Sequence, residues 1–325
     1  MMHLGIDLSK RYFDATLRLP KGEKVHGQFE NNAGGFKVLA TWLKKHKAKV
    51  VHACMEATNI YWEALAAFLH AAGHRVSVVN PARIKGFAMS QLRRNKTDKQ
   101  DSDVTVDFCY ATNPDAWTPP TPTQQKLRAL VRHRDGLLKT LTQEKNRVAD
   151  CQDEDVRASL QRVIDALQHE LDRLEEQITQ FIAQDETLSA QKALLLSIKG
   201  FGPVVTHKLL AEMPDLAAYA DAHAAAADAG VTPAHFESGD TVRRKAKMSK
   251  VGKAALRGAL YFPAITAMRF NPSVKALVQR LEQRHKPWKV ILGAAMRKLM
   301  HLAYGVLKNK TPFDPTYGLP PVVAT

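Results

Sequence analysis

The chain has 325 residues, of which 45% are hydrophobic and 24% charged, so it is long enough for two ordinary domains and is not intrinsically disordered. No stretch approaches the roughly 18 apolar residues of a membrane-spanning helix, and no signal-peptide pattern opens the chain. The three cysteines fit no disulfide or zinc spacing. We therefore expect a reduced cytoplasmic protein with no membrane partner.

The formal net charge is +15, and most of it is concentrated near the C-terminus. Between residues 241 and 310, seventeen Lys and Arg stand against one acid, Glu282, whereas the rest of the chain is nearly neutral. Concentrated positive charge attracts polyanions and releases counterions when phosphates bind. Because these cations are mixed with Gly, Ser and aromatic residues, nucleic acid is favoured over an acidic lipid surface or merely solvated charge.

The N-terminal third predicts an α/β domain with a mixed sheet. Alternating apolar residues indicate strands at 3–8, 12–19, 24–30, 50–56 and 75–79. Helical patterns begin near 31–35 and cover 61–72 and 98–112, and residues 83–96 are expected to form a basic loop. Three successive strands followed by alternating helix and strand are typical of a sheet covered by helices.

A Pro- and Thr-rich linker at 113–123 separates this region from a helical one. Apolar residues spaced alternately four and three apart then predict a coiled coil or a long helical hairpin; they are Leu160, Ile164, Leu167, Leu171, Leu174, Ile178 and Phe181. Such a seam also makes self-association plausible. We expect three domains: an α/β domain at 1–122, with helix 123–150 packing on either neighbour, a coiled-coil region at 123–187, and a helical domain at 188–325.

Two features of the C-terminal region have alternative interpretations. Gly200 and Gly202 lie in a turn between two apolar helical stretches, where they form either a phosphate-binding helix–hairpin–helix or an ordinary tight turn. Trp288 lies ahead of an apolar helix at 290–307, where it either stacks on a base or, as we favour, packs against a neighbouring helix.

Four carboxylates stand out by their positions in the predicted elements. Asp7 lies within the first strand, where a charge is costly unless it is paired or binds a metal. Glu56 ends the fourth strand, at an edge where sites gather in α/β sheets. Asp98 and Asp101 project from one face of a helix's first turn. Together they predict a two-metal phosphoryl-transfer site, although each acid alone fits a surface or helix-start residue.

The order of these motifs resembles a bacterial transposase family, the DEDD transposases of insertion sequence 110 type, with its eleven-eleven subgroup as a further match. The N-terminal motifs are Gly5-Ile6-Asp7, Glu56-Ala57-Thr58 and the run from Asn95 to Asp101. The C-terminal ones are Gly230 to Pro233, Glu237-Ser238-Gly239, Met248 to Lys250 and Leu256-Arg257. Asn59 and Ser102, which follow two of the motifs, differ from the Gly and Ala expected there.

The resemblance implies a RuvC-like domain of RNase-H-like fold, a coiled coil and a mainly helical transposase domain. It implies that Asp7, Glu56, Asp98 and Asp101 bind Mg²⁺ or Mn²⁺ and that Ser238 attacks the DNA backbone to form a transient serine–DNA link. It also implies donor and target DNA, a structured non-coding guide RNA (a bridge or seeker RNA), and a homo-oligomer, dimer or tetramer, as partners.

The residues themselves do not single out Ser238, because Glu-Ser-Gly-Asp is typical of a surface turn. Cations and glycines that we expect to contact nucleic acid are Arg243, Arg244, Lys245, Lys247, Lys250, Lys253, Arg257, Gly200 and Gly202. Two alternatives stay open: a RuvC-like nuclease that uses metal-activated water as its nucleophile, and a nucleic-acid-binding protein without catalysis.

Overall fold

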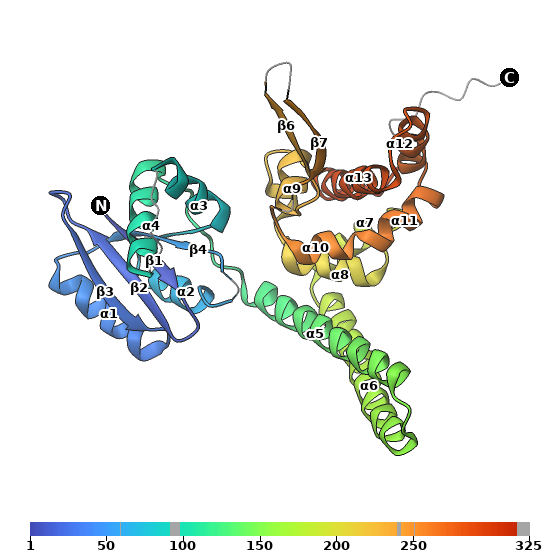
Figure 1. Cartoon of the computed structure of the whole chain (residues 1–325), viewed down its shortest axis with the longest axis horizontal. Coiled ribbons are helices and arrows are strands. Elements are labelled where there is room, and N and C mark those ends of the chain that lie inside the picture. Colours follow the sequence, from blue (N-terminus) through green and yellow to red (C-terminus); the bar gives the residue numbers. More distant parts are fainter. Residues whose placement is uncertain (59, 92–97, 239–241, 250, 317–325) are drawn as a thin grey trace. The chain divides into compact units, whose positions relative to one another are not determined.

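The computed structural model describes residues 1–58, 60–91, 98–238, 242–249 and 251–316, with residues 98–99, 235–238 and 242–246 described by their backbone alone. The chain divides into two compact units, Met1–Pro119 and Pro120–Thr325 (Figure 1).

The N-terminal unit is built on one mixed sheet of five strands. These are β1 (Met2–Leu8), β2 (Tyr12–Arg18), β3 (Lys24–Glu30), β4 (Val51–Glu56) and β5 (Arg75–Val79). Their spatial order is β3-β2-β1-β4-β5; the first three run antiparallel, and β4 runs parallel to both β1 and β5. The predicted mixed α/β sheet is confirmed, with each strand within a residue or so of its expected position.

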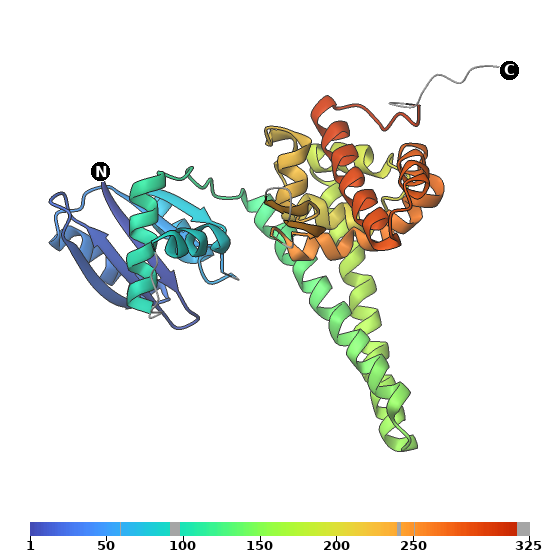
Figure 2. The ribbon, with the colours of Figure 1, turned by 45° about the horizontal axis from the view of Figure 1, so that its top comes forward.

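Helices cover both faces of this sheet (Figure 2). Successive strand side chains point to opposite faces, so Leu4, Ile6 and Leu8 all enter the same core. That core is closed by α1 (Ala33–Lys45) and α2 (Glu63–Ala71). The opposite face is covered by α4 (Asp98–Thr112), beside which α3 (Pro81–Ser90) packs.

The prediction of a basic loop at 83–96 is wrong for the first half of this segment, because residues up to Ser90 belong to α3. The Asn80 side chain accepts a hydrogen bond from the Ala82 amide at 2.9 Å, and Pro81 occupies the first helical position. Asn-Pro here is a helix start, since Asn satisfies an orphan amide and Pro has its φ preset for a helix. The second half of that loop lies largely outside the described residues.

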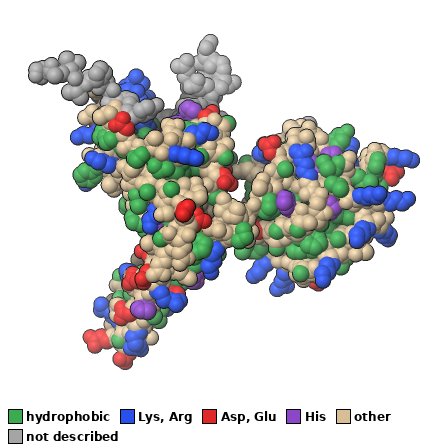
Figure 3. Space-filling model, turned by 180° about the vertical axis from the view of Figure 1, so that it is seen from behind, with side chains coloured by type: hydrophobic (Ala, Val, Ile, Leu, Met, Phe, Trp, Pro, Cys, Tyr) green, Lys and Arg blue, Asp and Glu red, His purple; other side chains and the backbone are tan. Residues whose placement is uncertain are grey.

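The second unit begins with a helical hairpin of α5 (Pro122–Asp150) and α6 (Glu154–Ala183). Thr121 and Gln124 form a reciprocal capping box, so the helix starts inside the predicted linker. The predicted seam on α6 packs against α5 of the same chain; Leu167 and Phe181 are only partly buried, and Ile182 closes the seam instead. Acidic and basic side chains alternate over the outside of the hairpin, as expected for a solvated surface (Figure 3).

The rest of the unit is mainly helical, as predicted. Its helices are α7 (Glu186–Leu196), α8 (Pro203–Glu212), the 3₁₀ turn η1 (Leu216–Ala218), α9 (Ala222–Asp228), α10 (Ala254–Ala259), α11 (Tyr261–Phe270), α12 (Pro272–Gln283) and α13 (Trp288–Asn309). By length and composition α13 could span a membrane, which the sequence prediction had excluded. Its apolar side chains fill the core of this unit, however, and that burial accounts for its composition.

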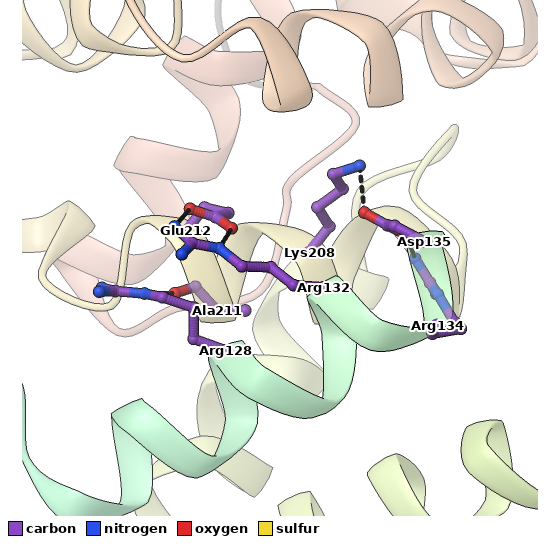
Figure 4. Close-up of polar contacts among 7 residues, drawn as sticks. All are labelled: Arg128, Arg132, Arg134, Asp135, Lys208, Ala211 and Glu212. Carbon is purple, nitrogen blue, oxygen red and sulfur yellow. Dashed lines mark hydrogen bonds and ion pairs between the residues drawn. The ribbon is translucent and has the colours of Figure 1, made fainter. Parts of the chain in front are cut away.

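Polar contacts attach the hairpin to α8 (Figure 4). The Arg132 guanidinium donates two hydrogen bonds to the Glu212 carboxylate, at 2.8 and 3.1 Å, and Arg128 Nε donates to the Ala211 carbonyl at 3.2 Å. Paired guanidinium–carboxylate bonds fix orientation as well as distance. The hairpin is therefore anchored at its α8 end by directional contacts in addition to apolar packing.

Two strands that the sequence analysis did not predict interrupt the helices. β6 (Pro233–Ser238) and β7 (Val242–Met248) form an antiparallel hairpin whose register shifts between Ala234 and Phe236. The domain is thus mainly helical, as expected, and the two strands are an addition to that prediction. The available signal was Ser238-Gly239-Asp240, a turn sequence lying between two short runs.

Candidate active site and nucleic-acid interface

Asp7 and Glu56 lie near the same edge of the sheet. Their strands β1 and β4 are parallel neighbours, and Ile6 pairs with Met55, so the next residues of the two strands are adjacent. Both acids are partly buried. The two carboxylates therefore come from neighbouring strand ends, which is the arrangement that the sequence predicted for them.

Both acids also point to the face that α4 covers. A Cβ at Gly5 would lie 2.3 Å from the Ser102 carbonyl oxygen of α4, and the Cys54 thiol shares a hydrogen bond with Cys109 of α4. Asp7 and Glu56 lie two residues after Gly5 and Cys54, and side chains two apart share a face. The strand alternation thus directs both carboxylates toward α4.

The direction of α4 brings its first turn to these acids. The His3 ring contacts the Tyr110 ring at 5.3 Å between centroids, whereas Gly5 lies against the turn from Ser102 to Val106. Moving along β1 from His3 to Gly5 therefore means moving along α4 toward its N-terminus. Two strand residues cover about 6.6 Å, which is the length of roughly four helical residues. Continuing two residues to Asp7 therefore reaches the start of α4, where Asp98 and Asp101 lie.

Hydrogen bonds between buried groups hold α4 on the sheet. The Ser102 and Thr16 hydroxyls are 2.8 Å apart, and both residues are buried. Ser102 is the residue that differs from the Ala expected at this place, and its hydroxyl is matched by that of Thr16. The hydrogen bond to Cys109, together with burial, raises the pKa of the Cys54 thiol, so this thiol stays protonated.

Asp14 is a further carboxylate on this face that the sequence analysis missed. It pairs directly with Asp7 across β1 and β2 and is only 6% exposed. Its carboxylate accepts hydrogen bonds from Gln28 Nε2 at 3.1 Å and lies 2.8 Å from His26 Nε2. Its position in an alternating strand was the available signal. The two partners of Asp14 are on β3 and hold its side chain in place. Asp14 therefore adds a carboxylate beside Asp7 at a fixed position.

A complete metal-binding set is not seen among the described side chains, where no three His, Cys, Asp or Glu residues converge. The predicted set of four includes Asp98, whose carboxylate lies outside that description. The structure thus brings Asp7 and Glu56 to one edge and Asp101 to the helix that faces it, and metal binding by the four acids stays a prediction.

Ser238 is the last residue of β6 and pairs with Val242, the first of β7. The predicted surface turn falls on residues 239–241, outside the described part of the chain. Four of the predicted nucleic-acid contacts lie together on β7: Arg243, Arg244, Lys245 and Lys247. Lys250 is also outside the described residues. The serine is therefore presented at the end of a two-stranded hairpin that carries a dense group of cations.

Two other predicted cations have structural partners. The Lys253 ammonium forms an ion pair with Asp228, and the Arg257 guanidinium donates to the Gly230 carbonyl at 3.4 Å. These contacts join α10 to the end of α9. Contacts of the two side chains with nucleic acid stay predictions.

Packing explains one glycine of the α7–α8 turn. Gly200 has φ of +113°, and a Cβ there would lie 2.8 Å from the Ala267 side chain of α11. Gly202, in contrast, has open space around its Cα. Asn271 also holds the turn, by donating to the Lys199 carbonyl at 3.0 Å. The turn is thus integrated into the helical core, and a phosphate contact stays a prediction.

Trp288 does not pack as we had favoured. It is the first residue of α13, and the residue is 51% exposed. Pro287 immediately before it starts the helix there, so the indole belongs to a first turn that faces solvent.

Two family models and two known proteins match this chain. A transposase family model of DEDD type matches residues 4–154, and the model of the transposase IS116/IS110/IS902 family matches residues 192–279. Two pilin gene-inverting proteins, from Moraxella bovis and Moraxella lacunata, are each 32% identical over 322 residues, which cover 96% of this chain and 97% of theirs. The chain belongs to the insertion-sequence transposase family of IS110 type, whose members are DNA transposases and recombinases.

Proposed function

We propose that the chain recombines DNA through a serine–DNA intermediate, with Asp7, Glu56, Asp98 and Asp101 of an RNase-H-like, RuvC-like domain forming the metal-binding part of the active site. The observation that carries this proposal is the location of Asp7 and Glu56 at neighbouring parallel strand ends, on the face where α4 begins with the other two acids. Transposases of DEDD type typically depend on metal ions.

The donor chemistry fits Mg²⁺ or Mn²⁺, because all four side chains offer carboxylate oxygens and Asp14, the β2 residue that pairs with Asp7, is also acidic. When bound, such ions stabilise negative charge on a phosphate and lower the pKa of a coordinated hydroxyl. The four acids would hold these ions at the edge of the sheet. Asp14, held by His26 and Gln28, adds negative electrostatic potential there, which attracts cations to the site.

Ser238 is the proposed nucleophile. Its Oγ forms a bond to the DNA phosphorus while the bond from phosphorus to a deoxyribose oxygen breaks, so the phosphodiester energy is kept in the new link. The serine loses its hydroxyl proton, and the leaving deoxyribose oxygen gains one. Attack by the hydroxyl end of another strand reverses these changes, restores the serine and rejoins the DNA. Cations of β7 lie on the same hairpin to hold the flanking phosphates.

A structured guide RNA selects the donor and target DNA in this proposal, and a homo-oligomer, dimer or tetramer, brings the two duplexes together in the bacterial cytoplasm. The concentrated basic region supports binding of polyanions, and the family supports recombination. Sequencing of RNA that co-purifies with the chain tests the guide. A specific, folded RNA from the flanking element is the expected result, whereas only bulk cellular RNA contradicts guidance.

Trapping of the covalent link tests the chemistry. With labelled donor DNA, the wild-type chain should give a protein–DNA adduct that survives denaturation, and Ser238→Ala should remove the adduct and strand exchange, with RNA binding retained. Free cleaved ends without an adduct would support the water-dependent nuclease. Asp7→Asn and Asp101→Asn should each lower the rate by at least about a hundredfold; unchanged activity of both would instead favour a protein without metal catalysis.

A further inference from the structure

A cavity of about 400 Å³ lies where the base of the β6–β7 hairpin meets the first turns of α13. Its walls are mostly apolar. Pro233 and Met248 contribute from the two strands, and Val290, Gly293 and Ala294 from the helix. Met248 lies so close to Gly293 that a Cβ on this glycine would be 3.1 Å from the Met248 methyl group. The hairpin and the helix thus form the apolar floor of the cavity together, and the space above this floor is open.

The rim of this cavity is positively charged. Lys247, Lys289 and Arg297 line it, and none of the nine described lining residues is acidic. Lys247 and Lys289 are exposed, so their ammonium groups can reach a ligand. Arg297 is held from behind by His223, whose Nδ1 lies 2.6 Å from a guanidinium nitrogen. An apolar floor under three cations fits a ligand that is flat and apolar on one part and anionic on another.

The beginning of α13 adds to the attraction for an anion. This helix has 22 residues, and Pro287, the residue before it, gives no side-chain hydrogen bond to the amides of the first turn. Lys289 and Val290 of that turn line the cavity. The N-terminal end of a helix carries a partial positive charge and favours phosphate groups.

We propose that this cavity binds one unpaired nucleotide of the DNA substrate, with the base on the apolar floor and its phosphate between Lys247, Lys289 and Arg297. Its volume lies within the range of small-molecule sites. The family acts on DNA, and strand exchange separates bases from their partners. Base contacts of this kind tolerate any sequence because every base has an apolar face.

The position of the cavity relates it to the strand that is cut. Pro233 and Ser238 are the two ends of β6, so the cavity and the serine are about 17 Å apart along the strand. That distance is roughly five nucleotide steps of duplex DNA. The bound nucleotide thus lies a few steps from the attacked phosphate. Binding of the nucleotide uses only the family's action on DNA and does not depend on the four acids, whereas its distance from the attacked phosphate rests on the proposed role of Ser238.

Binding measurements without divalent metal separate the base from the phosphates. The full chain is titrated with a fluorescent single-stranded thymidine oligonucleotide and with an abasic oligonucleotide of the same length. Ala294→Leu fills the cavity from a partly exposed helical position. It should weaken binding of the thymidine strand roughly tenfold while leaving the abasic strand within about twofold. Lys289→Gln should weaken both strands and lower the salt dependence by about one phosphate contact.

Matched variants and a second oligonucleotide complete the test. Ala193→Leu places the same side chain on an exposed site of α7, away from the cavity, and should change neither affinity. Val290→Ala, which removes part of the wall and favours helix, should weaken the thymidine strand selectively even if Ala294→Leu misfolds. If Ala294→Leu and Val290→Ala both keep the wild-type ratio of affinities for the thymidine and abasic strands, the proposal is overturned. Selective weakening of a uridine RNA strand alone overturns the assignment to DNA.

Discussion

The two units support their candidate catalytic side chains in different ways. Asp7 and Glu56 stand on a five-stranded sheet against which α4 packs with backbone nearly touching backbone, at Gly5. Ser238 stands at the end of a two-stranded hairpin whose base meets α13 through flexible side chains and an open cavity. Where backbones pack closely, a side chain that gains volume displaces the elements that carry the site. Where a hairpin borders an open cavity, the same added volume is accommodated without such a displacement.

Both units bury polar side chains, and each leaves some of their atoms without a hydrogen-bond partner among the described residues. In the N-terminal unit, Thr16 bonds Ser102 and His52 bonds Ser77 at 2.7 Å, while His52 Nδ1 finds no partner among the described residues. In the C-terminal unit, the buried His207 Nε2 and Thr206 hydroxyl find none there either. Unsatisfied buried groups cost stability. The close packing at Gly5 predicts that the first unit is sensitive to added volume, and the burial of His207 predicts that the second is sensitive to protonation of this ring.

The largest expected effect is that of Gly5→Ala. The added methyl group would lie 2.1 Å from the Val106 amide nitrogen and 2.3 Å from the Ser102 carbonyl oxygen, and neither backbone atom can rotate away. Because α4 must then move from the sheet, we expect the free energy of unfolding to fall by about 3 kcal/mol or more. Recombination should be lost with it, since Asp98 and Asp101 move with α4. Denaturant titration and a strand-exchange assay measure the two effects.

Gly86→Ala is the matched control for this substitution. Gly86 lies in α3 of the same unit, and a Cβ there meets no atom within 4 Å. Alanine favours helix over glycine, so stability should stay constant or rise by up to about 1 kcal/mol. Equal stability of the Gly5 and Gly86 variants would contradict the close packing of α4 on β1.

A smaller effect is expected in the C-terminal unit on acidification. Burial, with Lys192 and Arg134 nearby, lowers the pKa of His207 to about 4 from its ordinary value of 6.5. A histidine that is neutral when folded contributes stability above pH 6.5, and this contribution is lost as the pH falls from 6.5 toward 4, because the unfolded chain binds the proton first. The loss between pH 7 and pH 4 is about 2 to 3 kcal/mol.

Comparison of wild type with His207→Gln isolates this contribution. The variant should lose less stability than wild type over the same pH range, by the amount just given, in denaturant titrations at each pH. His169→Gln, at an exposed position of α6, should keep the wild-type pH dependence. Parallel curves for wild type and His207→Gln would show that His207 does not titrate in this window.

Periodicity made the sheet and the helical seam predictable, because each depends on a repeat that is local in sequence. The same holds for the placement of Asp7 and Glu56, which follows from strand ends alone. Asp14 was missed because its position in an alternating strand marks it only as a polar residue on one face, and its importance comes from pairing with Asp7 across two strands. The exposure of Trp288 likewise depends on where α13 starts relative to its neighbours.

The β6–β7 hairpin was missed for a different reason. Its second strand reads Val-Arg-Arg-Lys-Ala-Lys-Met, whose dense charge obscures the alternation that marks a strand. The bulge between Ala234 and Phe236 also shifts the alternation on the first strand. In this region the cations that we predict to contact nucleic acid occupy positions where apolar residues would have revealed a strand.

The smallest effect expected is also the sharpest test of the comparison, namely Gly293→Ala. Its added methyl group meets only the Met248 methyl, at 3.1 Å, and that flexible side chain borders open space. A gain in helix propensity of up to about 1 kcal/mol offsets the contact, so we expect stability within about 0.5 kcal/mol of wild type or slightly above it. The same chemical change at Gly5 and at Gly293 should thus differ by about 3 kcal/mol. A loss above about 2 kcal/mol at Gly293 would mean that the hairpin base is as tightly packed as the sheet, and Ser238 would then stand on a support as rigid as that of the acids.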